Sequence, residues 1–155
     1  MSLVFAPAPP ERLADIDRLI RAAFAPYIRA LGREISPDAY GWFAEAIAQG
    51  DIYAASDGTD IAGAIVTRRH DRDLELALIG VSPQRQKQGI AGWMIGRIEE
   101  LARRRGYATL SLNTAEMMTD RVRLYSRHGF EIVGRGPPTH GKDAHTRVYM
   151  EKALI

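Results

Sequence analysis

VSPQRQKQGIAG, residues 81–92, joins the end of a strand-like run to the start of a long helical pattern. The first N–H groups of a helix lack partners within the helix and carry partial positive charge, so they attract phosphate. Gly89 and the small Ala91 allow a ligand close to the backbone, and Arg85 and Lys87 add positive charge at the rim. The turn therefore predicts a diphosphate site built mostly from main-chain amides, although an ordinary strand–helix turn with exposed polar residues would read the same way.

Other ligand motifs do not fit this sequence. The P-loop G-x-x-x-x-G-K-[ST] is absent, and the dinucleotide fingerprint G-x-G-x-x-G would need glycine where the chain has Ala91 and Met94. The chain has no cysteine, which excludes a disulfide scaffold, a thiol nucleophile and a zinc–cysteine site. The four histidines lack metal-binding spacing, so no metal is expected.

Downstream of the turn, the pattern alternates between helix and strand. Apolar residues at helical spacing continue to Ala102, and Gly106 ends that helix. We predict a strand over 108–113, a helix from about Met117 to His128, and two closing strands over 130–133 and 146–152. A strand, a helix and a strand in succession predict a right-handed parallel crossover.

Upstream of the turn, the sequence predicts an edge strand over 3–6 and a first helix after Pro10. A second helix is predicted from Ser36, as its N-cap, to Gly50. Strands over 52–56, 61–67 and 74–81 follow, joined by tight turns, and they predict an antiparallel meander. The elements together form an α/β sheet of about seven strands.

Size and composition favour a single domain spanning residues 1–155, with 46% apolar and 26% charged residues. A net charge of +2 makes no strong field, and Arg103–Arg105 at a helix end lack an accompanying series of aromatics, so no nucleic-acid partner is expected. The first ten residues do not resemble a signal peptide, and no apolar run is long enough to cross a bilayer. We expect a cytoplasmic protein without a membrane partner.

The chain resembles the GNAT acetyltransferases at two separate places. Gln86–Ala91 matches their signature [Q/R]-x-x-G-x-[G/A] between the fourth strand and the third helix, and Val81–Pro83 matches the usual lead-in. Residues 124–130, LYSRHGF, look like the late LYxxxGF element of the family. The resemblance implies an α/β (α+β) fold with a mixed, mostly antiparallel seven-stranded sheet and about four flanking helices.

The same resemblance implies acetyl transfer from acetyl-CoA, as co-substrate, to a primary amine of a small molecule or peptide by direct attack in a ternary complex. Val81 would offer main-chain groups to the pantetheine arm and the thioester carbonyl. Asn113 would bond the pantetheine amides, or instead cap a turn. The CoA pyrophosphate would lie on the backbone of Gln86, Lys87, Gln88, Gly89, Ile90 and Ala91.

Two side chains are candidates for proton transfer. The family match places the Tyr125 phenol near the CoA sulfur, where it could protonate the leaving thiolate; the alternative is a core tyrosine. Glu75 is the candidate general base, because Glu75 and Val81 share one face of their strand if no bulge intervenes. The alternatives are a surface-facing acid and ordered water in place of a side-chain base. Gly80 either marks a bulge or packs closely.

The acceptor site in such enzymes lies between the first two helices and the late strands. Tyr27 and Arg33, in a connection expected over 24–33, could face the acceptor, as could His140 or His145. A free amino acid, a polyamine, a drug-like amine and a peptide amine all remain open. A non-catalytic CoA-binding or regulatory module is the alternative function, and a homodimer, frequent in such enzymes, is also left open.

Overall fold

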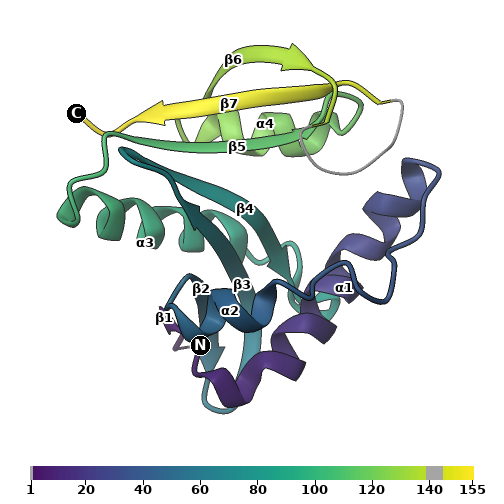
Figure 1. Ribbon diagram of the computed structural model, residues 1–155, viewed down its shortest axis with the longest axis vertical. Helices are drawn as coiled ribbons and strands as arrows, with labels where there is room; N and C mark the ends of the chain where they lie inside the picture. Colours follow the sequence, from purple (N-terminus) through teal and green to yellow (C-terminus); the bar gives the residue numbers. More distant parts are fainter. Residues whose placement is uncertain (1, 139–144) are drawn as a thin grey trace.

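A computed structural model describes residues 2–138 and 145–155. One seven-stranded sheet has the strand order β1-β2-β3-β4-β5-β7-β6 (Figure 1). Every neighbouring pair is antiparallel except β4 and β5, which are parallel. The strands are β1 (Val4–Pro7), β2 (Ile52–Asp57), β3 (Asp60–Arg69), β4 (Asp73–Val81), β5 (Thr109–Ala115), β6 (Glu131–Gly136) and β7 (Arg147–Ala153).

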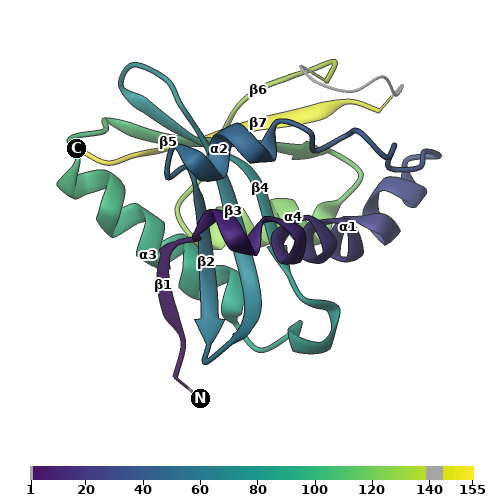
Figure 2. The ribbon, with the colours of Figure 1, turned by 60° about the horizontal axis from the view of Figure 1, so that its bottom comes forward.

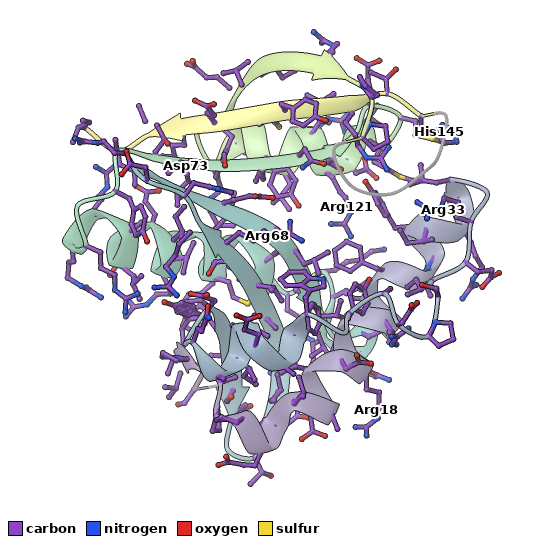
Figure 3. The ribbon with its side chains drawn as sticks, in the orientation of Figure 1. Arg18, Arg33, Arg68, Asp73, Arg121 and His145 are labelled. Atoms are coloured by element: carbon purple, nitrogen blue, oxygen red, sulfur yellow. The ribbon has the colours of Figure 1, made fainter. Side chains whose placement is uncertain are left out.

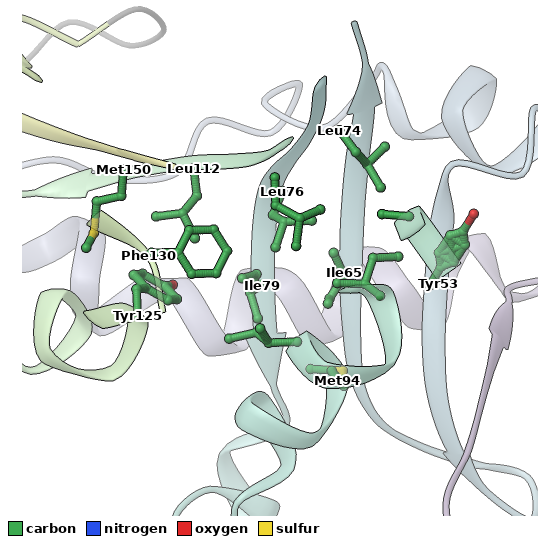
Figure 4. Packing of buried hydrophobic residues seen from close by; sticks show 14 of the residues in the cluster. Tyr53, Ile65, Leu74, Leu76, Ile79, Met94, Leu112, Tyr125, Phe130 and Met150 are labelled. Atoms are coloured by element: carbon green, nitrogen blue, oxygen red, sulfur yellow. The ribbon is translucent and has the colours of Figure 1, made fainter. Parts of the chain in front are cut away.

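Helices cover both faces of this sheet, as Figure 2 shows for α1 and α2 in front and α3 behind. The described helices are η1 (Pro10–Arg12), α1 (Leu13–Ala30), α2 (Phe43–Ala48), η2 (Pro83–Arg85), α3 (Ile90–Arg104) and α4 (Thr119–Arg127). One buried cluster lies under α1 and α2. The other lies under α3 and α4, and Figure 4 shows part of it. This arrangement confirms the predicted α/β (α+β) class, the mostly antiparallel sheet and the parallel crossover.

The first helix extends further than the sequence predicts. α1 continues through Pro26 to Ala30, whereas a connection was expected over 24–33. A proline inside a helix removes one backbone hydrogen bond. Two aromatic anchors hold the last turns: Phe24 is buried, and the Tyr27 hydroxyl accepts the Ala115 N–H at 2.9 Å.

The second helix is shorter than predicted and begins only at Phe43. The segment from Ser36 forms successive turns instead, with the Ala39 N–H bonded to the Ser36 carbonyl at 3.1 Å. The Arg21 side chain from α1 donates to the carbonyls of Ser36 and Pro37 at 3.0 and 2.8 Å. Because Arg21 of α1 bonds to these carbonyls, the segment from Ser36 lies against α1 and does not start a helix.

The sheet divides into two halves because β4 and β5 separate after the first residues of β4. β4 pairs with β5 only from Asp73 to Glu75, whereas β5 pairs with β7 along its whole length. β4 also contains a bulge at Ala77, because Thr67 and Val66 of β3 pair with Leu76 and Leu78. The C-terminal end of β4 therefore has β3 on one edge and an opening on the other.

Among the described residues, no helix combines the length and the apolar character needed to span a membrane.

Candidate active site

A cavity of about 840 Å³ lies at the opening between β4 and β5. Its walls come from four places in the chain: α1, the end of β4, the turn before α3, and α4 with the residues just before it. Val81, the turn around Gly89, and Tyr125 all line it. The fold thus brings together most of the residues that the sequence singled out.

The turn before α3 presents backbone amides to this cavity. Lys87 and Gly89 both adopt left-handed conformations, with φ of 65° and 80°. Left-handed residues in a turn arrange N–H groups into a concave anion site. Gly89 is the N-cap of α3 and makes no side-chain cap hydrogen bond. The first amides of the helix are therefore not engaged by a capping side chain.

Arg85 contributes less to the rim charge than its sequence position suggests. Its guanidinium pairs with Asp60 at 3.0 Å and lies 3.7 Å from Asp57. These ion pairs fix the turn to the β2–β3 hairpin. Lys87 forms no salt bridge within the described residues, and it is the cation that remains at the turn.

The main chain of Val81 faces the open edge of β4. Ser82 donates its N–H to the Ala62 carbonyl of β3 at 2.8 Å. Successive residues of an antiparallel strand direct their N–H and C=O groups to opposite edges, so those of Val81 point away from β3. The Gln86 side chain donates to the Val81 carbonyl at 3.1 Å. The Val81 N–H points to the same open edge of β4, and Val81 lines the cavity.

Tyr125 is 5% exposed, and it is both a core residue and a cavity-lining residue. Its ring packs edge-on against Phe130 with centroids 6.2 Å apart. Burial raises the pKa of the Tyr125 phenol; the charge and a hydrogen bond of Arg121 oppose this, and Tyr27 adds to it. The phenol is therefore protonated at neutral pH and can donate a proton.

Arg121 is a cavity residue that sequence reasoning missed. Its guanidinium lies 5.1 Å from the ring centroid of Phe24 and 4.9 Å from that of Tyr27 (Figure 3). It also precedes Tyr125 by one helical turn, so both side chains lie on one face of α4. That spacing was the available signal, but only the packing of α1 shows that the cation sits in the cavity.

Tyr27, one of the residues that could face the acceptor, lines the cavity. Its hydroxyl accepts the Ala115 N–H at 2.9 Å and lies 3.1 Å from the Thr114 hydroxyl. Arg33 and His145 do not line this cavity, although Figure 3 places both on the same side of the molecule as Arg121. His140 lies outside the described residues.

Glu75 and Asn113 are not brought to Tyr125. Both line a second, smaller cavity of about 250 Å³ with Tyr149. The Glu75 carboxylate lies 2.8 Å from His70 Nε2 and 3.4 Å from the Arg68 guanidinium.

The bulge at Ala77 explains the position of Glu75. Leu74 and Leu76 pack in the same buried cluster as Ile79 and Val81, so the alternation changes phase between them. The condition for Glu75 to share a face with Val81 therefore fails. Asn113 is exposed because it alternates with the buried Leu112 on the other face of β5.

Gly80 is a site of close packing and not of the bulge. A Cβ atom there would lie 3.0 Å from Ile20 Cδ1 and 3.3 Å from Ala23 Cβ of α1. The glycine therefore allows α1 to approach β4. Within residues 2–138 and 145–155, no group of three or more His, Cys, Asp or Glu side chains is placed to hold a metal ion.

Comparisons with known proteins agree with this fold. The PaiA N-acetyltransferase from Thermoplasma acidophilum, solved in complex with coenzyme A, is 18% identical and has a TM-score of 0.77 over 99% of each chain. Ard1 from Thermoplasma volcanium is 13% identical, with a TM-score of 0.80 over 100% of this chain and 99% of that one. The ribosomal-protein-S18-alanine N-acetyltransferase from Escherichia coli is 17% identical, with a TM-score of 0.73 over 99% and 94%. At these identities the likeness shows the fold.

No curated protein matches the sequence. The model of the acetyltransferase (GNAT) family matches residues 15–130, which is more than half of the chain and includes both the turn and Tyr125. The chain therefore belongs to the GNAT family of acetyltransferases, and it is an acyl-CoA-dependent N-acetyltransferase.

Proposed function

We propose that this protein transfers an acetyl group from acetyl-CoA to a primary amine of a small molecule or peptide, by direct attack in a ternary complex. The observation that carries the proposal is one cavity that holds the amides of the turn, the open edge at Val81 and the Tyr125 phenol. The turn amides would bind the diphosphate, Val81 would donate to the oxyanion, and Tyr125 would act as the acid. CoA would pass these three features in that order, from its diphosphate to its sulfur.

The CoA diphosphate would lie on the backbone from Gln86 to Ala91. The left-handed Lys87 and Gly89 and the uncapped start of α3 support this placement. Solved proteins of the same fold carry this ligand: the PaiA enzyme with coenzyme A and a GNAT acetyltransferase from Elizabethkingia anophelis with acetyl-CoA. Asn113 faces the second cavity, so the pantetheine contact expected of it has no support from its position.

The thioester would lie beside Val81, whose N–H would donate to the carbonyl oxygen as negative charge develops there. The neutral amine attacks the carbonyl carbon, a C–N bond forms, and the C–S bond breaks. The departing thiolate takes the Tyr125 proton, and the phenolate recovers a proton released by the amine nitrogen. The products are the amide and free CoA.

The amine must first lose its ammonium proton. Glu75 can accept that proton only through intervening water, because it lines the other cavity and already contacts Arg68 and His70. Solvent in the main cavity is the more direct acceptor in this mechanism.

The test follows free thiol after mixing the protein with acetyl-CoA and a pooled panel of amines. Thiol release should depend on the amine, and Tyr125→Phe should lower kcat by roughly 10²-fold or more, the usual range for a lost general acid. Tyr107→Phe is the matched control, because Tyr107 does not line the cavity. CoA binding without turnover on any amine would instead indicate a non-catalytic CoA-binding module.

A further inference from the structure

We propose that Arg121 binds a carboxylate of the acceptor, and that the preferred acceptors are amino acids whose carboxylate lies next to the amine. This inference rests on the proposed function and narrows it, because the sequence left amino acids, polyamines, drug-like amines and peptides equally open.

Arg121 is held in a fixed position at the cavity wall. Its guanidinium packs on the faces of Phe24 and Tyr27, which lie at right angles to each other with centroids 5.8 Å apart. Phe24 is buried, and the Tyr27 hydroxyl is bonded to the end of β5. Stacking occupies the face of a guanidinium and leaves N–H groups at its edge, which match a carboxylate in pairs.

Arg121 also lacks a counter-ion. No carboxylate lies within 4.0 Å of it among the described residues, whereas its neighbour on α4, Arg123, pairs with Asp120 at 3.6 Å. Arg85 in the same cavity pairs with Asp60. A cation that packs against two rings loses part of its hydration, and an anion supplied by a ligand would offset that cost.

The position of Arg121 determines where such an anion would sit. Tyr125 is one helical turn away and close enough for Arg121 to affect its titration. A carboxylate on Arg121 would therefore lie beside the proposed site of acetyl transfer. In an α-amino acid the amine and the carboxylate share one carbon, so both groups would fit this site together.

The same charge disfavours the other acceptor classes. A polyamine would bring a second cation toward the guanidinium, and repulsion between like charges grows when water is excluded. A peptide N-terminus carries a neutral amide in place of the carboxylate, and it would leave the Arg121 cation without a counter-ion. The CoA diphosphate is not an alternative anion here, since the turn before α3 accounts for it.

The experiment compares α-amino acids with their α-amides, and with spermidine, at saturating acetyl-CoA. The wild type should favour the free acids at least tenfold in kcat/KM. Arg121→Met keeps an apolar stem between the rings and should abolish that preference while the KM for acetyl-CoA stays within twofold. Arg121→Lys should keep part of the preference for free acids. Arg123→Met, on the same helix, should behave as wild type.

A preference for amides or spermidine, or a preference for free acids that survives Arg121→Met, would overturn the inference while leaving acetyl transfer intact. Calorimetry gives a readout that does not need turnover. The CoA-saturated wild type should bind N-acetyl amino acids at least tenfold more tightly than their amides, and Arg121→Met should not. Failure to bind CoA at all would overturn the proposed function, whereas CoA binding without this discrimination would overturn only the role of Arg121.

Discussion

The Tyr125 side chain belongs to the hydrophobic core and also lines the cavity, because α4 packs beside the opening between β4 and β5. A phenol in this position loses hydration, which disfavours the phenolate. The positive charge of Arg121 acts in the opposite direction and lowers the pKa of the Tyr125 phenol. Burial thus keeps the proton on Tyr125 in the resting enzyme, and in the proposed mechanism Arg121 is a cation beside the phenolate that forms when the proton is given away.

This environment predicts how Tyr125 titrates. Its pKa is raised in the folded protein, so the neutral phenol should persist above the ordinary tyrosine value of about 10. The stability that this group contributes is fully present below about 10 and is lost as the pH rises through the higher folded-state pKa. Ultraviolet absorbance of the wild type minus that of Tyr125→Phe isolates this phenol. Ionisation below about 10 would contradict the account.

The turn before α3, together with α3, is the element on which the proposed CoA site depends. Gly89 adopts a φ of 80°, and a Cβ there would meet no atom within 4 Å. Replacement by alanine therefore introduces backbone strain without a steric clash. Gly96, in the interior of α3, has the same open space and no positive φ, so it offers a matched comparison.

Gly89→Ala should lower the free energy of unfolding by about 1 to 2 kcal/mol, the cost of a left-handed conformation. It should also weaken CoA binding, since the strained turn would relax away from the ligand. Gly96→Ala should raise the free energy of unfolding by about 0.5 to 1 kcal/mol and leave CoA binding unchanged. Denaturant unfolding and calorimetry measure both effects. Equal behaviour of the two variants would show that the turn conformation does not matter.

The opening between β4 and β5 interrupts the sheet, and Tyr27 bridges it. α1 packs against β3 and β4, whereas the Tyr27 hydroxyl bonds to Thr114 and Ala115 of β5. One side chain thus connects the two halves of the sheet at the end where they separate.

Tyr27→Phe should remove this connection and leave the Ala115 N–H without its acceptor. We expect a loss of about 1 to 3 kcal/mol in the free energy of unfolding, the range for an unsatisfied buried group. Exchange of the Ala115 amide with solvent should accelerate more than exchange in β2 and β3. Unchanged stability and exchange would mean that the halves are held together elsewhere.

Much of this fold was predictable because the residues that begin and end its helices are local sequence signals. Gly89, Gly106 and Gly129 all have positive φ next to helix ends, where the sequence placed them. The misses depend on contacts distant in the sequence. Arg21 holds the segment before α2, and the bulge at Ala77 changes the face of Glu75 without any local signal. The proposed role of Arg121 likewise depends on where α1 packs.

We propose that amides of the turn hold the CoA diphosphate at the opening of the sheet. An NMR titration of the labelled protein with CoA tests it at each backbone amide. The largest shifts should occur at Gly89, Ile90 and Ala91, with smaller ones at Val81 and Tyr125. Shifts confined to the second cavity, around Ser111 and Asn113, or no shifts at saturating CoA, would contradict it.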